Sequence, residues 1–227
     1  MTIDKEKLDK ITEFMSNGEF NEAIALINAI LEDYPNNIIL MLDLAYSYAN
    51  LSRYDKAIEL YTKIIELAPE NSSGYTGLGF IYRKQGKNEA AIKEFTKGII
   101  YAPDNAIAHF EKAEALFEID QYEEALKSYY KALQFSGAET EAETLHRIAQ
   151  VNLGLKNYDK AIKIANDVLS RDPGYISASN VIAIAYYLME DWKNAELHFE
   201  KYLKSVPEDE SASKLLHEIK EKLNENK

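Results

Sequence analysis

The four histidines are the residues of this 227-residue chain best suited to metal binding or acid–base chemistry, since the chain contains no cysteine. No two of them stand four residues apart, the spacing that places two imidazoles on one helix face to hold zinc. His146 with Glu143 comes nearest to a ligand pair, and a surface contact accounts for that pair better. The histidines are His109, His146, His198 and His217.

Motifs that bind phosphate or activate a nucleophile are missing from the sequence. There is no G-x-S-x-G, no P-loop and no G-x-G-x-x-G. The many carboxylates fit solvated helix faces rather than an acid–base pair. We therefore expect no catalytic residue, no cofactor and no metal, and a protein that is not an enzyme.

The net charge and the distribution of apolar residues argue against several classes of binding partner and against membrane insertion. The net charge of −12 argues against nucleic acid, whose phosphates favour a basic surface, and against direct binding to anionic lipid. The longest apolar runs are too short to span a bilayer, so no membrane insertion is expected. The first ten residues, MTIDKEKLDK, lack the apolar stretch of a secretory signal, which favours a cytoplasmic protein.

The prolines and a column of alanines follow a common period. Pro35, Pro69 and Pro103 are 34 residues apart, as are Pro173 and Pro207. A fixed period of this length predicts stacked repeats that share one continuous core, and hence a single domain over residues 1–227. The alanine column keeps the same spacing, with a slip of two after its fourth member: Ala23, Ala57, Ala91, Ala125, Ala161 and Ala195.

Each repeat holds two apolar patterns of helical period, separated by a short polar turn such as Leu51-Ser52-Arg53. Pro69 ends the second helix of its repeat, because proline lacks an N–H and disfavours a helical residue before it. Small residues recur in the first helices and bulky ones in the second, which predicts close packing of facing helices. The small column is Ala45, Gly79, Ala113, Ala149 and Ala183, and the bulky one is Tyr61, Phe95, Tyr129 and Phe199.

The third repeat carries a known pattern in full: Tyr75, Leu78-Gly79, Tyr82, Ala91, Phe95 and Pro103. In this the chain resembles the tetratricopeptide repeat (TPR) family, over about residues 4–209. The resemblance implies an all-α fold, a right-handed α-solenoid of antiparallel helix pairs. The expected repeats are 4–37, 38–71, 72–105, 106–139, 142–175 and 176–209, followed by an amphipathic capping helix over 210–225.

The repeat pattern breaks after the fourth repeat, where two extra residues occur and Gly137 stands in place of proline. One interpretation is a slightly longer helix that begins at Gly137. The other is a flexible joint between residues 1–136 and 142–227.

The TPR resemblance also implies which side chains face a concave groove: those at the second, fifth, ninth and twelfth positions of each repeat. In repeats two to four these include Ala49, Ser73, Thr76 and Ile107, and Asp43, Glu111, Glu114 and Glu118 add acidic points. Because the packing columns are already assigned, we expect the groove positions to be exposed and to bind a partner. The candidate groove residues are Leu42, Asp43, Tyr46, Phe80, Arg83, Phe110, Glu114, Phe117, His146, Ile184 and Tyr187.

The expected function is therefore a scaffold or adaptor that holds a hydrophobic or basic-amphipathic segment of another protein, as an extended peptide or a helix. The alternative is a structural scaffold that assembles with itself into a homo-oligomer. An acidic chaperone tail is a disfavoured partner. TPR domains that bind such tails use a clamp of lysine, asparagine and arginine, and the corresponding positions here are Leu8, Thr12, Asp43, Ser73 and Gly77.

Overall fold

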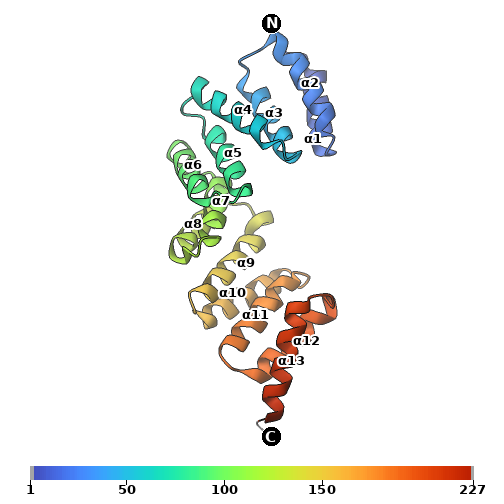
Figure 1. Cartoon of the computed structure of the whole chain (residues 1–227), viewed down its shortest axis with the longest axis vertical. Helices are drawn as coiled ribbons and strands as arrows, with labels where there is room; N and C mark the ends of the chain where they lie inside the picture. Colours follow the sequence, from blue (N-terminus) through green and yellow to red (C-terminus); the bar gives the residue numbers. More distant parts are fainter. Residues whose placement is uncertain (1–2, 226–227) are drawn as a thin grey trace. The chain divides into compact units, whose positions relative to one another are not determined.

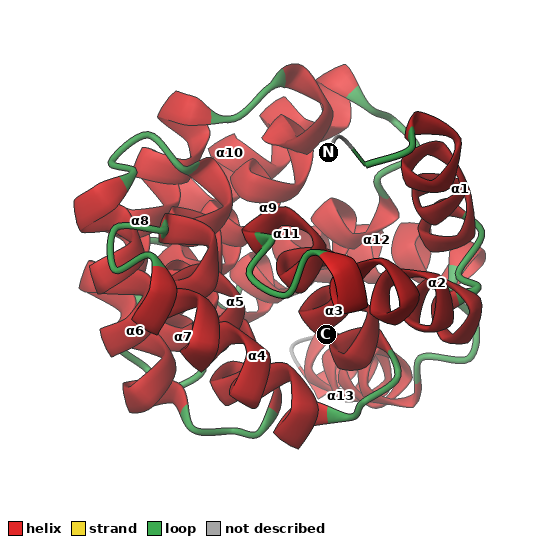
Figure 2. Cartoon of the chain, turned by 90° about the horizontal axis from the view of Figure 1, so that it is seen from above, coloured by secondary structure: helices red, strands yellow, loops and turns green. Residues whose placement is uncertain are grey.

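The computed structural model describes residues 3–225, and the side chains of all of these except residues 138 and 139. Over this range the chain consists of helices joined by short loops, with no strand (Figures 1 and 2), which confirms the expected all-α fold of consecutive helix pairs. The helices are α1 (Lys5–Ser16), α2 (Phe20–Asp33), α3 (Ile38–Asn50), α4 (Tyr54–Leu67), α5 (Ser72–Lys84), α6 (Asn88–Tyr101), α7 (Ala106–Phe117), α8 (Tyr122–Phe135), α9 (Ala138–Gly154), α10 (Tyr158–Arg171), α11 (Ile176–Leu188), α12 (Trp192–Ser205) and α13 (Glu210–Glu225).

The helices gather into two compact units, Met1–Ala115 (unit 1) and Leu116–Lys227 (unit 2), and each is described by itself. The division falls inside α7, not at the irregular junction near Gly137. The expected single domain stays a prediction.

Asparagine begins the first helix of three successive repeats in unit 1. The side-chain oxygens of Asn37, Asn71 and Asn105 each accept a hydrogen bond from the backbone N–H three residues later, at 3.1, 2.8 and 3.0 Å. Each bond satisfies one of the N–H groups that a helix leaves without a partner at its start. The 34-residue period is thus also a period of helix caps.

The turn inside each helix pair contains one residue in the left-handed conformation. These residues keep the spacing of the alanine column, slip of two included, and only two of them are glycine. One left-handed residue reverses the chain within a few residues, so the two helices of a pair lie against each other. In order they are Gly18, Ser52, Gly86, Asp120, Lys156 and Glu190, with φ between 55° and 75°.

Replacing Gly86 with alanine is expected to destabilise unit 1 by about 1 kcal/mol, because a Cβ makes the left-handed conformation costly. No atom lies within 4 Å of the position where that Cβ would be, so steric overlap with neighbours adds nothing. Gly137 is the matched control: its surroundings are equally open, but its φ is −81°. Urea denaturation followed by circular dichroism should show little change for Gly137→Ala. Equal losses at both positions would contradict the conformational explanation.

Apolar faces of the paired helices form the core of unit 1. Its larger cluster runs from α1 to α5 and includes the fully buried Ile27, Leu40 and Ile64. A second cluster joins Ala91 and Phe95 of α6 to Ala115 of α7. The small and bulky columns of the sequence also meet inside the unit, since the Phe95 ring lies directly against Gly79.

In unit 2, the irregular junction near Gly137 leads into a long helix. Helix α9 has 17 residues and begins at Ala138 with Gly137 as its cap, which confirms the longer helix expected there. Flexibility of this joint stays a prediction. At the other end, α13 buries Ala212 and Ile219 against α12, and Lys220 forms an ion pair of 2.8 Å with Glu200.

Candidate functional site

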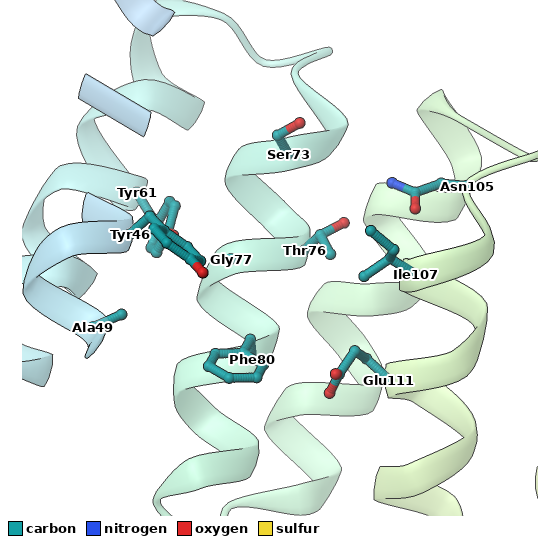
Figure 3. A pocket seen from close by; sticks show the side chains of 10 residues that line it. All are labelled: Tyr46, Ala49, Tyr61, Ser73, Thr76, Gly77, Phe80, Asn105, Ile107 and Glu111. Atoms are coloured by element: carbon teal, nitrogen blue, oxygen red, sulfur yellow. The ribbon is translucent and has the colours of Figure 1, made fainter. Parts of the chain in front are cut away.

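The first helices of three successive repeats, α3, α5 and α7, together form a pocket in unit 1. The pocket has a volume of about 290 Å³. Residues 34 positions apart occupy equivalent places on these helices, so the 34-residue register brings them to one surface. The pocket is lined by Tyr46, Ala49, Tyr61, Ser73, Thr76, Gly77, Phe80, Asn105, Ile107 and Glu111 (Figure 3).

Aromatic rings form one wall of this pocket. Figure 3 shows the rings of Tyr46 and Tyr61 together beside Gly77, with Phe80 further along α5. Tyr46 is 50% exposed, and its ring packs at a steep angle against that of Phe20, with centroids 6.1 Å apart. Tyr61 comes from α4, the second helix of its pair, and is buried. The wall therefore contains an exposed ring, that of Tyr46, and a buried core ring, that of Tyr61.

Gly77 is the residue that lets Tyr61 reach the pocket. A Cβ at position 77 would overlap the Tyr61 ring, so any other residue type would displace it. The same place in the preceding and following first helices holds Asp43 and Glu111. The glycine therefore makes room for an aromatic ring between two carboxylates.

The carboxylates of Asp43 and Glu111 differ in their surroundings. Glu111 pairs with Arg83 at 2.8 Å, and both side chains are largely buried. Burial raises the pKa of Glu111, an effect that the guanidinium of Arg83 opposes. Burial also raises the pKa of Asp43, with no cation to offset it. Burial, and then the charges of Tyr46 and Asp43, raise the pKa of Tyr61 to about 12.

The candidate residues of unit 1 divide into those that line the pocket and those that do not. Tyr46 and Phe80 line it, together with four further groove positions of the sequence analysis and the acidic Glu111. Leu42 packs against the core, and Arg83 holds Glu111. Phe110 is partly buried. Glu114 is only 8% exposed, so the expectation that it faces solvent is wrong.

The candidate residues of unit 2 make separate contacts. The Phe117 ring lies 5.6 Å from that of Tyr122, and Ile184 packs against the core. Tyr187 donates a hydrogen bond of 2.9 Å to Glu218 of α13.

His146 is 7% exposed, which corrects both its expected exposure and its interpretation as a surface contact. Its ring lies 5.2 Å from the ring of Tyr175. Burial and the neighbouring charge of Arg147 lower the pKa of His146 to about 4. A neutral imidazole is therefore part of the packing of unit 2.

Three lining residues are missing from the groove prediction: Tyr61, Gly77 and Asn105. The sequence places Tyr61 in the bulky packing column of the second helices, and most of its side chain is indeed buried. The glycine at position 77, where the neighbouring repeats have carboxylates, is the signal in the sequence that marks this opening.

Within residues 3–225, no helix is long and apolar enough to cross a membrane. The same part of the chain holds no group of three or more His, Asp or Glu side chains placed to bind a metal ion.

Comparison with known proteins identifies the repeat. The family model described as "Tetratricopeptide repeat" matches residues 8–72 and 77–140, and two further models with this description match residues 60–93 and 142–175. No curated protein matches the chain.

Several solved structures share the fold. MamA is 24% identical, with a TM-score of 0.66 over 74% of this chain and 90% of its own. YrrB, described as a TPR protein with an unusual peptide-binding site, is 20% identical, with a TM-score of 0.72 over 86% of this chain and 97% of its own. A tetratricopeptide repeat protein from Parabacteroides merdae is 17% identical, with a TM-score of 0.66 over 95% of this chain and 98% of its own.

Proposed function

Because this chain belongs to the tetratricopeptide repeat family, we propose that it is a non-catalytic scaffold that holds a segment of a partner protein at the pocket of unit 1. TPR proteins bind other proteins or peptides, and this pocket offers a shaped, accessible surface for such a partner. The observation that carries the proposal is a pocket with aromatic and aliphatic lining on three successive first helices.

Exposed apolar side chains recur at one position of the first helices, since Ile39 and Ile107 are two repeat periods apart. Ile107, at the rim, is 67% exposed, and Ile39 of α3 is 70% exposed. Large apolar side chains that remain in water in a chain of net charge −12 suit a surface that a partner covers. Among solved structures of this fold, YrrB is described as having a peptide-binding site. Its 20% identity supports the fold alone, so the proposal rests on the residues of this chain.

The chemistry of the pocket favours a hydrophobic or basic-amphipathic segment as its occupant. A carboxylate tail is disfavoured, because the half-buried Asp43 would repel it and none of the clamp positions carries a lysine or arginine. Nucleic acid is disfavoured by the acidic surface for the same electrostatic reason.

Truncating Tyr46 to alanine is expected to weaken partner binding by on the order of 2 kcal/mol, because a half-exposed tyrosine at a pocket rim is typical of a binding hot spot. The matched control is Tyr101→Ala. Tyr101 is also in unit 1, is 48% exposed and contacts one other ring, that of Tyr75, but lies outside the pocket. Its loss should leave the affinity within about twofold.

The measurement is capture from cell extract on the wild-type chain, followed by titration of the captured protein against both variants. Equal affinities for Tyr46→Ala and Tyr101→Ala would argue against the pocket as the binding site. A second copy of this chain is the other occupant that the sequence allows. Light scattering distinguishes it, because a strict monomer at high concentration excludes self-assembly.

A further inference from the structure

Three aromatic side chains from three helices meet at the pocket of unit 1: Tyr46 of α3, Tyr61 of α4 and Phe80 of α5 (Figure 3). A purely apolar pocket could be built from leucine and isoleucine. Aromatic rings add a negative face to their apolar surface, and that face attracts a cation. The composition of this wall is therefore informative about the charge of the occupant.

The pocket also has a carboxylate beside it without a counter-ion. Asp43 is half-buried, and no Lys, Arg or His of the described chain lies within ion-pair distance of its side chain. It does not line the pocket, but it lies on α3 one turn before the lining Tyr46, at the place that Gly77 holds on α5. Glu111, on the opposite helix, is already paired with Arg83. A half-buried carboxylate without a partner is destabilised, and a cation brought by a ligand would remove that penalty.

We propose that this pocket binds the cationic side chain of a lysine or arginine from the partner segment, between the rings of Tyr46, Tyr61 and Phe80 and beside the carboxylate of Asp43. This inference rests on the proposed function and specifies its partner: a segment with a basic anchor residue. The aliphatic stem of such an anchor would lie against Ile107 and Ala49, which line the same pocket.

The chain itself contains the contact that the proposal requires. Lys84 places its ammonium 5.2 Å from the centroid of Phe80, within the range of a favourable cation–π contact. Lys84 lines a neighbouring hollow, which shares Tyr46 and Phe80 with the pocket, and does not line the pocket itself.

Two short peptides test the proposal on the full chain: acetyl-Gly-Lys-Gly-amide and the same peptide with norleucine. Norleucine has the straight aliphatic chain of lysine without the ammonium. Titrations are followed by nuclear magnetic resonance at the Gly77 amide and the Ile107 methyl groups. The lysine peptide should bind with a Kd about tenfold lower than the norleucine peptide, and the difference should shrink as salt is added.

Variants of the chain distinguish the effect of the Asp43 charge on peptide binding from the effect of apolar packing. Asp43→Asn should remove most of the advantage of the lysine peptide and leave norleucine binding unchanged. Glu59→Gln makes the same change of net charge at an exposed site of α4 outside the pocket, and should change neither. Tyr46→Leu keeps an apolar side chain but removes a ring face, so it should weaken the lysine peptide selectively.

Three outcomes would overturn the inference: equal binding of the two peptides, no shift at Gly77 with either, or an unchanged lysine affinity in Asp43→Asn. Tighter binding of norleucine would leave the proposed docking function standing with an apolar anchor. The docking function itself is tested independently, by the affinity of the captured partner for the wild-type chain and for the Tyr46→Ala variant.

Discussion

Replacing Phe95 with alanine is expected to destabilise unit 1 by about 3–5 kcal/mol, the cost of emptying a closed aromatic site. The ring is fully buried in a cluster with Ala91 and Ala115. It also lies so close to α5 that a Cβ added at Gly79 would be 2.8 Å from its ring carbons. Its fully buried neighbours Ala91 and Ala115 are too short to fill the cavity that the ring would leave.

Urea denaturation followed by circular dichroism measures this loss. Ile100→Ala is the control on the same helix, since Ile100 is 68% exposed and should change stability by less than about 0.5 kcal/mol. If Phe95→Ala costs no more than the control, the ring does not hold α5 and α6 together in the way the packing indicates.

Lowering the pH from 7 to 4 is expected to reduce the stability of unit 2 by about 3 kcal/mol through His146 alone. Burial and the charge of Arg147 lower the pKa of this imidazole to about 4 in the folded chain. In the unfolded chain its pKa is about 6.5. Between these values the unfolded state binds the proton and the folded state does not. The contribution is therefore fully present above pH 6.5 and is lost as the pH falls through 4.

Other acidic and basic groups also titrate, so the comparison is between the wild-type chain and His146→Gln across the same pH range. Wild-type stability should fall more steeply below pH 6.5 than that of the variant. The Nδ1 atom of His146 has no hydrogen-bond partner among the described residues, so glutamine removes the titration without breaking a side-chain bond there. Parallel pH profiles would show that folding does not lower the pKa of His146.

The periodicity of the sequence was sufficient to predict the helix pairs and the register of unit 1. Proline and the left-handed turn residues are set by backbone geometry, and the fully buried alanines by the close packing of neighbouring helices. The same register predicted six of the pocket positions, because residues 34 apart occupy equivalent places on successive first helices. Those positions are Tyr46, Ala49, Ser73, Thr76, Phe80 and Ile107.

The position of the pocket could not be predicted from the repeat pattern, because it depends on a contact between two different helices. Tyr61 follows the packing column of the second helices, and it reaches the pocket only because Gly77 of α5 has no side chain. Periodicity assigns a residue to one face of its own helix. It does not reveal what the neighbouring helix leaves open.

Burial at Glu114 and His146 was missed for a related reason. A polar residue at a groove position is expected to face water, yet Glu114 is 8% exposed and His146 is 7% exposed. In the case of His146, burial and the charge of Arg147 favour the neutral imidazole, whose ring lies 5.2 Å from that of Tyr175.

Photo-crosslinking tests the central claim, that a partner is held at the pocket of unit 1. A photoreactive phenylalanine analogue is placed at Ile107, on the pocket rim, or at Ile100, on α6 outside the pocket. The two sites are equally exposed, at 67% and 68%. Irradiation with the captured partner should give a covalent adduct from position 107 and none from position 100. An adduct from position 100 with none from position 107 would place the partner elsewhere and contradict the account.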